Sequence, residues 1–92
     1  MGWDVALAHA VLTTTYVTTR REPVVEVSHE LDEDGAVVWQ FLGATPDYRP
    51  EVLLLVRLDE ILALAPHVMA VADLELGARA VWESGRWRVV SP

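Results

Sequence analysis

The sequence contains no cysteine. This absence excludes disulfide bonds, thiolate nucleophiles and zinc sites with sulfur ligands, and it fits a reducing compartment. The first residues lack the basic start of a secretory signal, and no apolar run approaches the roughly 18 residues that a bilayer-spanning helix needs. We therefore expect a cytoplasmic protein with no membrane contact.

Catalytic motifs are missing as well. The five glycines stand singly in the sequence, so no glycine-rich loop is available to cradle a phosphate. No serine lies in the sharp strand-to-helix turn that exposes a hydrolase nucleophile. The histidines, His9, His29 and His67, lack the spacing of metal ligands. We therefore expect a protein that is not an enzyme and that holds no metal or cofactor.

An enzyme remains an alternative in one case. His29 and Glu30 are neighbours, but adjacent residues of a strand project to opposite faces and cannot converge on one substrate. Catalysis would require a pocket that gathers His29 or His67 with acids distant in the sequence. Otherwise we interpret His29 as a half-buried structural residue.

Basic residues are scarce. Seven arginines and lysines stand against fourteen acidic residues, which gives a formal net charge of −7. Such a charge repels phosphate backbones and anionic lipids, so we expect no nucleic-acid partner. Two interpretations stay open: the charge serves solubility, or it attracts a basic protein.

Composition and periodicity predict one folded domain spanning residues 1–92. Apolar residues make up 52% of the chain and supply enough surface for a core. β-branched residues dominate 11–19, apolar residues alternate over 24–30, and they recur at every second position in 37–41, three patterns typical of strands. The turn residues at 32–35 join the last two segments into a hairpin.

The second half alternates between strand and helix signals. Residues 52–56 form a continuous apolar run, typical of a strand that is buried on both faces at the centre of a sheet. Asp59 stands where a helix N-cap is expected, and Pro66 ends that helix and begins another. Gly77 then suits a left-handed turn.

A second hairpin is expected at the end of the sequence, with strands at 78–83 and 86–90 around Ser84-Gly85. Residues 43–50, which contain two prolines and a glycine, indicate a loop. Residues 1–10 fit either a short helix capped by Asp4 or an extension of the first strand, and we favour the helix. The predicted fold class is α+β: an antiparallel sheet of five or six strands with two short helices packed on one face.

Five carboxylates fall within nine residues around the first hairpin, at Glu26, Glu30, Asp32, Glu33 and Asp34. The spacing does not match a calcium-binding EF-hand, although a loop that wrapped around calcium stays an alternative. A solvated hairpin tip and a docking surface for a basic partner are the other two interpretations.

Aromatic residues give a further set of candidates. Trp39, Trp82 and Trp87 lie on alternating strands and face the same way as valines, so we expect them, with Val89, to pack in the core rather than form a recognition platform. Tyr48 and Arg49 lie in the proline-flanked loop, and both residue types recur at binding hot spots. The candidate partner-binding residues are therefore Glu30, Asp32, Glu33, Asp34, Tyr48 and Arg49.

The order of these features resembles a family of bacterial polymorphic-toxin immunity proteins, the class called immunity protein thirty-three, which is also described as a domain of unknown function. The resemblance rests on the strand pair at 15–30, the Trp39-Gln40-Phe41 signature with Gly43, the stretch 58–68, and the Leu76-Gly77 pair that follows it. It spans about residues 11 to 83. Ala65 departs from the family, which commonly has an aspartate there, and the loop around Tyr48 is shorter.

The resemblance implies a protein that neutralises a cognate toxin by direct binding. The expected partner is a basic toxin domain, which the acidic hairpin would engage, and the chain itself is expected to be a monomer or a homodimer. The departures from the family leave open a relative with another role. The alternative function is a small structural or regulatory domain that self-associates through the edge of its sheet.

Overall fold

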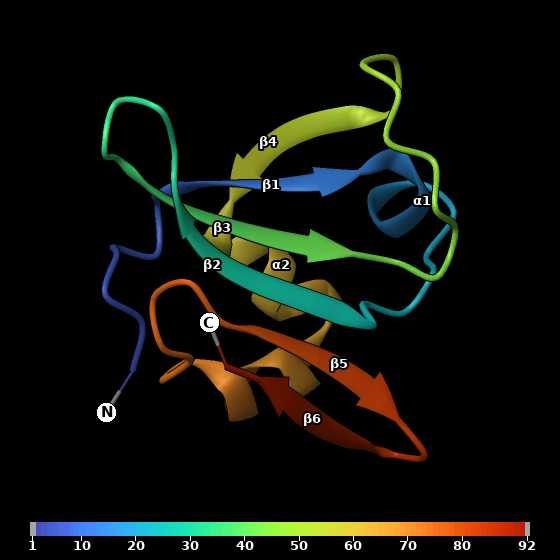
Figure 1. Cartoon of the computed structure of the whole chain (residues 1–92). Coiled ribbons are helices and arrows are strands. Elements are labelled where there is room, and N and C mark those ends of the chain that lie inside the picture. Colours follow the sequence, from blue (N-terminus) through green and yellow to red (C-terminus); the bar gives the residue numbers. More distant parts are fainter. Residues whose placement is uncertain (1, 92) are drawn as a thin grey trace.

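The computed structural model describes residues 2–91, and in it six strands form one mixed sheet with helices on one face (Figure 1). The elements are β1 (Ala10–Thr14), α1 (Thr15–Thr18), β2 (Glu26–Leu31), β3 (Val37–Leu42), β4 (Leu53–Arg57), α2 (Leu58–Leu64), the 3₁₀ helix η1 (Pro66–Val71), β5 (Arg79–Glu83) and β6 (Arg86–Val90). The strand order is β4-β1-β3-β2-β5-β6. The α+β class is thus confirmed, although residues 2–91 contain three short helices where two were expected.

The expectation of a purely antiparallel sheet is wrong at one pair of strands. β1 and β3 run parallel, while every other neighbouring pair is antiparallel. The reason lies in the connection after β1, which passes through α1 and residues 19–25 and reaches β2 on the far side of β3. The β2–β3 hairpin then places β3 between β2 and β1, and β3 runs parallel to β1. Parallel strands cannot be joined by a tight turn, and here the long segment from α1 through β2 connects them.

The first strand is shorter than the predicted segment 11–19. β1 ends at Thr14, and the next four residues form the helical turn α1. Thr15 donates its backbone N–H to the carbonyl of Val52, and its own carbonyl accepts from Thr19 and Arg20 at 2.8 and 3.1 Å. The turn buries Val17, so tertiary burial overrides the extended preference of this threonine-rich segment.

The strand predicted at 52–56 forms as β4, but its predicted central position is wrong. β4 lies at the edge of the sheet and pairs only with β1. No helix of the described residues covers the face of β4 that carries Leu55, and this side chain is 67% exposed. Uniform apolarity therefore does not mark a strand that is buried on both faces here.

α2 follows β4 directly and is the first element of the helical layer. Leu58 donates its backbone N–H to the carbonyl of His9, which carries the β1–β4 ladder to the first residue of the helix. The predicted N-cap is wrong, because Arg57 holds that position and Asp59 lies in the first turn, bound to the Arg57 guanidinium at 2.8 Å. Pro66 begins the next helix as predicted, and this helix is of the 3₁₀ type.

The N-terminal segment forms no helix between residues 2 and 9. The helix favoured for this segment is therefore wrong over those positions, and Met1 lies outside the described residues. Asp4 does not cap a helix, because its carboxylate accepts hydrogen bonds from Trp39 and His29 instead. The described part of the chain contains no helix long and apolar enough to cross a membrane.

Both predicted hairpins are confirmed. β2 and β3 pair with Val27 opposite Phe41, and β5 and β6 pair with Trp82 opposite Trp87. Ser84 and Gly85 adopt φ values of 51° and 78°, which is the left-handed pair that a two-residue hairpin turn requires.

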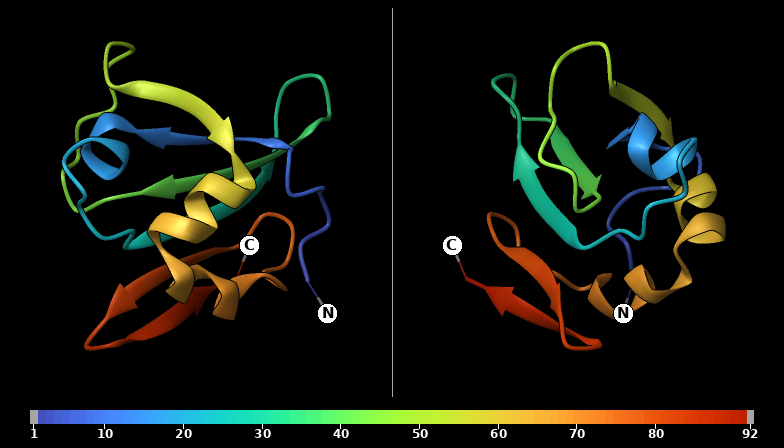
Figure 2. Two further views of the ribbon diagram at one scale, coloured as in Figure 1. Left: turned by 180° about the vertical axis from the view of Figure 1, so that it is seen from behind. Right: turned by 90° about the vertical axis from the view of Figure 1, so that its right-hand side faces the viewer.

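The core lies between one face of the sheet and the helical layer of α2 and η1, as the view from behind in Figure 2 shows. Its most buried side chains are Val11, Val17, Val24, Val27, Trp39, Phe41, Leu58, Ile61 and Val68. Trp82 and Trp87 are only half-buried and pack around His67, and Val89 is 56% exposed, contrary to the prediction for it. Within the described part of the chain, the opposite face of the sheet carries no helix.

We expect Leu58→Ala to lower the free energy of unfolding by about 2–5 kcal/mol, because it removes a fully buried side chain and leaves a cavity. The matched control is Leu7→Ala, which should change stability by no more than about 0.5 kcal/mol because Leu7 is 54% exposed. Urea unfolding monitored by tryptophan fluorescence measures both. Equal losses in the two variants would contradict the burial of Leu58 in the core.

Candidate protein-interaction site

The acidic hairpin tip, defined here as Glu30, Asp32, Glu33 and Asp34, is ordered by its own turn. Asp32 accepts backbone hydrogen bonds from Asp34 and Ala36 on one carboxylate oxygen, at 2.8 and 2.9 Å. Gly35 closes the turn with a φ of 81°, a conformation that glycine adopts without strain. Asp32 therefore shapes the tip, and this local bonding fixes the positions from which its neighbours project.

The other carboxylates of the tip remain free for a partner. Glu33 and Asp34 are exposed, and Glu30 is exposed and accepts one hydrogen bond from the Gln40 amide at 3.2 Å. Within residues 2–91, no arginine forms an ion pair with any of these carboxylates. The tip thus presents uncompensated negative charge on a rigid turn.

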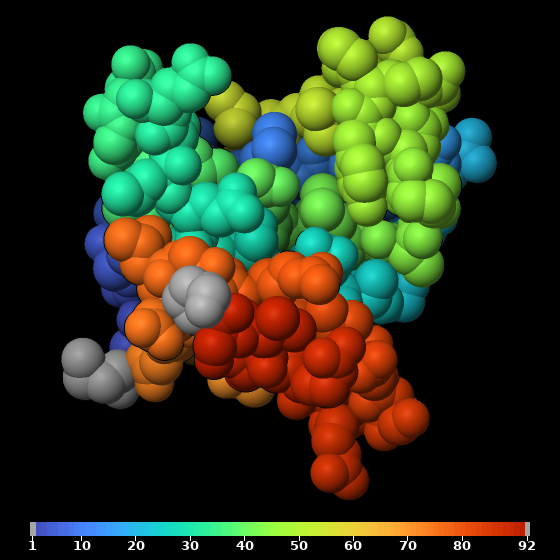
Figure 3. All heavy atoms as spheres, viewed as in Figure 1, coloured from blue at the N-terminus to red at the C-terminus, as the bar shows by residue number. Residues whose placement is uncertain are grey.

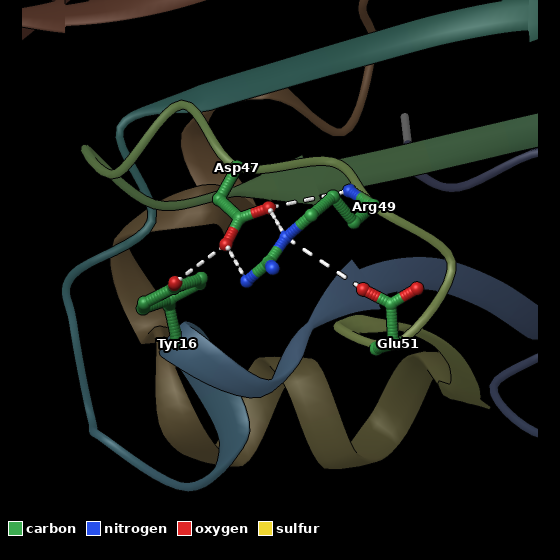
Figure 4. Close-up of polar contacts among 4 residues, drawn as sticks. All are labelled: Tyr16, Asp47, Arg49 and Glu51. Carbon is green, nitrogen blue, oxygen red and sulfur yellow. Dashed lines mark hydrogen bonds and ion pairs between the residues drawn. The ribbon is translucent and has the colours of Figure 1, made fainter.

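The loop between β3 and β4 is organised by a second polar cluster (Figure 4). The Arg49 guanidinium donates two hydrogen bonds to the Asp47 carboxylate, at 2.9 and 2.8 Å, and lies 3.7 Å from Glu51. The Tyr16 hydroxyl from α1 donates to Asp47 at 2.7 Å. Arg49 is therefore largely committed to holding the loop, whereas Tyr48 beside it is 48% exposed and makes no such bond.

The polar cluster shifts the ionisation of its members. Hydrogen bonds from Arg49 and Tyr16 hold the pKa of the Asp47 carboxyl well below its ordinary value of 3.8. The same bond to Asp47 raises the pKa of the Tyr16 hydroxyl. Asp47 therefore stays ionised throughout the ordinary pH range and keeps the loop bound to α1.

The start of the same loop is held from the other side. The Glu22 carboxylate accepts hydrogen bonds from the Thr45 hydroxyl at 2.6 Å and from its backbone N–H at 3.2 Å. Gly43 lets the chain approach closely, because a Cβ there would meet the Glu22 carboxylate at 2.7 Å. The loop is thus tied to the α1–β2 connection at its start and to α1 at Asp47 and Val52.

The fold does not bring the two predicted groups together. The acidic tip precedes β3 and the Tyr48 loop follows it, so the two groups lie about 20 Å apart at opposite ends of a six-residue strand. In the space-filling view of Figure 3 they stand as two lobes at the top of the molecule, with atoms of β1 and β4 lying lower between them. The six predicted residues therefore frame one face of the molecule rather than form one contiguous site.

Negative charge gathers at the hairpin side of the molecule. Arg49, Arg57, Arg79 and Arg88 pair with nearby carboxylates and neutralise charge elsewhere. The segment 73–77, which carries the exposed Asp73 and Glu75, lies at the same edge of the molecule as the hairpin tip (Figures 1 and 2). The field of the molecule is therefore asymmetric, as expected of a surface that attracts a basic partner.

A third cluster joins the N-terminal segment to the sheet, and the sequence did not predict it. Asp4 accepts hydrogen bonds from the Trp39 indole and the His29 ring, both at 2.9 Å, and the other His29 nitrogen donates to the Leu74 carbonyl at 2.7 Å. The His29 ring stacks on Trp39 with centroids 4.0 Å apart. Burial opposes ionisation of Asp4, but the bonds from Trp39 and His29 together lower its pKa.

This histidine–aspartate pair lines a surface pocket with Trp39, Ala72 and Asp73. It meets the geometric condition set above for an enzyme, since a fold-dependent pocket joins His29 to an acid distant in the sequence. Both His29 nitrogens are engaged by protein oxygens, however, one by the Leu74 carbonyl and the other by the Asp4 carboxylate, so neither is free to contact a substrate. The arrangement is that of a structural clamp.

His67 has a protein partner at one ring nitrogen, Nε2, and lines a different pocket with Glu22. Its ring donates to the Val24 carbonyl at 2.8 Å and stacks on Trp87, whose indole donates to the His67 carbonyl at 3.0 Å. Throughout residues 2–91, no three or more histidine, aspartate or glutamate side chains are grouped to hold a metal ion.

In comparisons with known proteins, no family model, no curated protein and no solved structure matches this chain. The resemblance to immunity proteins therefore stays a prediction. One missed residue had a sequence signal, since Asp47 stands two positions before Arg49 in a proline-flanked loop. Asp4 had none, because it lies 25 positions from His29.

We expect Asp4→Ala to lower the free energy of unfolding by about 1–3 kcal/mol, because it leaves the indole N–H of the buried Trp39 without an acceptor. Asp73→Ala is the control, since Asp73 lines the same pocket but is exposed, and it should stay within about 0.5 kcal/mol. Denaturant unfolding measures both. Comparable effects would show that the clamp does not stabilise the fold.

We expect Asp47→Asn to destabilise the protein at neutral pH and to lose this effect in acid. Because folding lowers the pKa of Asp47 below 3.8, its ionised form stabilises the fold fully above that pH, and the contribution is lost as the pH falls toward the folded value. Unfolding free energies of both proteins, measured at neutral pH and in steps below 3.8, should therefore converge. A constant gap at every pH would contradict the role of the Asp47 charge.

Proposed function

We propose that this chain is a protein-binding module without enzymatic activity, most specifically a bacterial immunity protein that neutralises a basic toxin by binding it. The observation that carries the proposal is the acidic hairpin tip, where exposed carboxylates without arginine partners project from an ordered turn. A surface that is charged, unpaired and rigid costs little entropy to order when a partner binds. The sequence resemblance described above agrees with this proposal.

Each carboxylate of the tip has a distinct part in this mechanism. Asp32 holds the turn through its backbone bonds, so it positions the tip. Glu33 and Asp34 are the groups free to accept hydrogen bonds from arginines or lysines of the toxin, and charge-assisted bonds of this kind are the stronger ones. Glu30 extends the same surface along β2.

The net charge of −7 adds a long-range electrostatic attraction to the binding of a basic partner. Oppositely charged partners are steered together, and this accelerates association at low ionic strength. Binding at the tip would then place the uncovered face of the sheet and the Tyr48 loop over the toxin surface. Neutralisation of this kind needs only steric occlusion, in agreement with a His29 that has no free nitrogen.

The test compares Glu33→Lys combined with Asp34→Lys against the natural chain as bait in a pull-down from native cell extract. We expect the natural chain to capture a basic protein and the double variant to lose it, because two attractive contacts become repulsive. Asp32 is left unchanged so that the turn persists. The control, Glu60→Lys with Glu83→Lys, changes net charge by the same amount at exposed positions outside the hairpin side and should retain capture.

The captured protein is then identified and expressed with and without this chain. Growth arrest that the natural chain relieves, and the hairpin variant does not, would support the immunity function. Loss of capture in both double variants would mean that overall charge, rather than the hairpin, governs binding. A captured protein that has no effect on growth would overturn the immunity assignment.

A further inference from the structure

The outer side of β4 offers a row of backbone groups without partners. Thr15 donates to the carbonyl of Val52, and Leu58 donates to the carbonyl of His9, so the even-numbered residues of this segment face β1. Backbone direction alternates along a strand, so the N–H and C=O groups of Leu53 and Leu55 and the N–H of Arg57 point outward. The Arg57 carbonyl is used at the start of α2, where Arg57 is the N-cap. No strand of the described chain pairs with them.

The centre of β4 also lacks the features that usually protect an edge. Natural edge strands carry charges, prolines or bulges that block pairing. β6, at the opposite edge, has exposed arginines at 86 and 88. The centre of β4 instead is Leu53-Leu54-Leu55, with Leu55 67% exposed, so it is the edge that favours a further strand.

Charge complementarity identifies the further strand as a second copy of β4. Leu53, Leu55 and Arg57 share the uncovered face, and Glu51 stands two positions before Leu53 in the turn that leads into β4, so an acidic and a basic residue flank the two leucines. We propose that two copies pair antiparallel about Leu54 into one continuous sheet. Arg57 then lies opposite Glu51 of the second copy, and Leu55 lies opposite Leu53 of the second copy, each pair occurring twice.

The charges also select this register over its neighbours. Pairing centred on Leu55 would place Arg57 opposite a leucine, and pairing centred on Leu53 would place it opposite Arg49 of the second copy, a repulsive contact. The Arg57 and Glu51 side chains are 58% and 68% exposed, so their contacts within one chain leave them accessible. The two-fold arrangement also brings the Tyr48 loop of one copy toward the acidic tip of the other, since these lobes flank β4 (Figure 3).

Sedimentation of the full chain over a concentration series tests the proposal. We expect the natural chain to form a dimer, and E51R or R57E alone to weaken it by about tenfold or more, because two attractive cross-strand pairs become repulsive. An equimolar mixture of E51R and R57E should restore the dimer, since every cross-strand pair in the mixed dimer is again opposite in charge. A natural chain that stays monomeric, or variants that dimerise unchanged, would overturn the proposal.

The absence of cysteine permits an independent measurement of register. Leu54 would lie opposite its own copy with Cα atoms about 4.5 Å apart, within the range of a disulfide, so Leu54→Cys should form an oxidised dimer on a non-reducing gel. Val52→Cys is the control, because its two copies would lie about 13 Å apart in this register. If Val52→Cys forms the cross-linked dimer and Leu54→Cys does not, the proposed register is wrong. In the sedimentation experiment, recovery of the dimer in the mixture of E51R and R57E shows that both charge variants fold.

Discussion

The satisfied indole of Trp39 is the constraint on which much of this fold depends. Trp39 is fully buried, and a buried N–H without an acceptor costs about 1–3 kcal/mol. Asp4 supplies the acceptor and also binds the ring of His29, which in turn bonds to the carbonyl of Leu74. One buried donor thus ties the N-terminal segment, two central strands and the segment after η1 into a single network.

Burial on only one face of the sheet explains where interaction surfaces remain. The helical layer of α2 and η1 consumes the apolar side chains of one face, including Ile61 and Val68. The other face keeps a mixed row across β4, β1 and β3, in which Leu55 lies beside Leu12 and Leu12 beside Gln40. No element within residues 2–91 covers that face, so the loops at the ends of the strands and the free edges of the sheet are what a partner of this part of the chain meets.

Local signals in the sequence predicted the local structure well. Both hairpins follow from turn residues that stand within a few positions of their strands, and Pro66 marks the start of η1 for the same reason. The parallel pairing of β1 with β3 and the edge position of β4 depend on which strands meet across the chain. No local pattern encodes that choice, and the apolar run of β4 predicted the opposite.

The same distinction between local signals and long-range contacts applies to the candidate site. The acidic tip was predicted because its carboxylates are adjacent in the sequence and a hairpin tip is exposed by geometry. The commitment of Arg49 to Asp47 was missed because it depends on Tyr16 from α1, which closes the cluster across 31 positions. A residue type that recurs at binding hot spots was here engaged in holding its own loop, a distinction that only the three-dimensional contacts provide.

The acidic tip and the edge of β4 are physically separable surfaces, and this permits both to operate in one molecule. Pairing through β4 uses outward backbone groups and the end charges of one strand, whereas the tip uses Glu33 and Asp34 on a turn at the far end of β3. A dimer centred on Leu54 would carry two acidic tips on one continuous sheet. Two linked tips raise the effective concentration of the second contact once the first has formed, so self-association would strengthen binding to a partner with two basic patches.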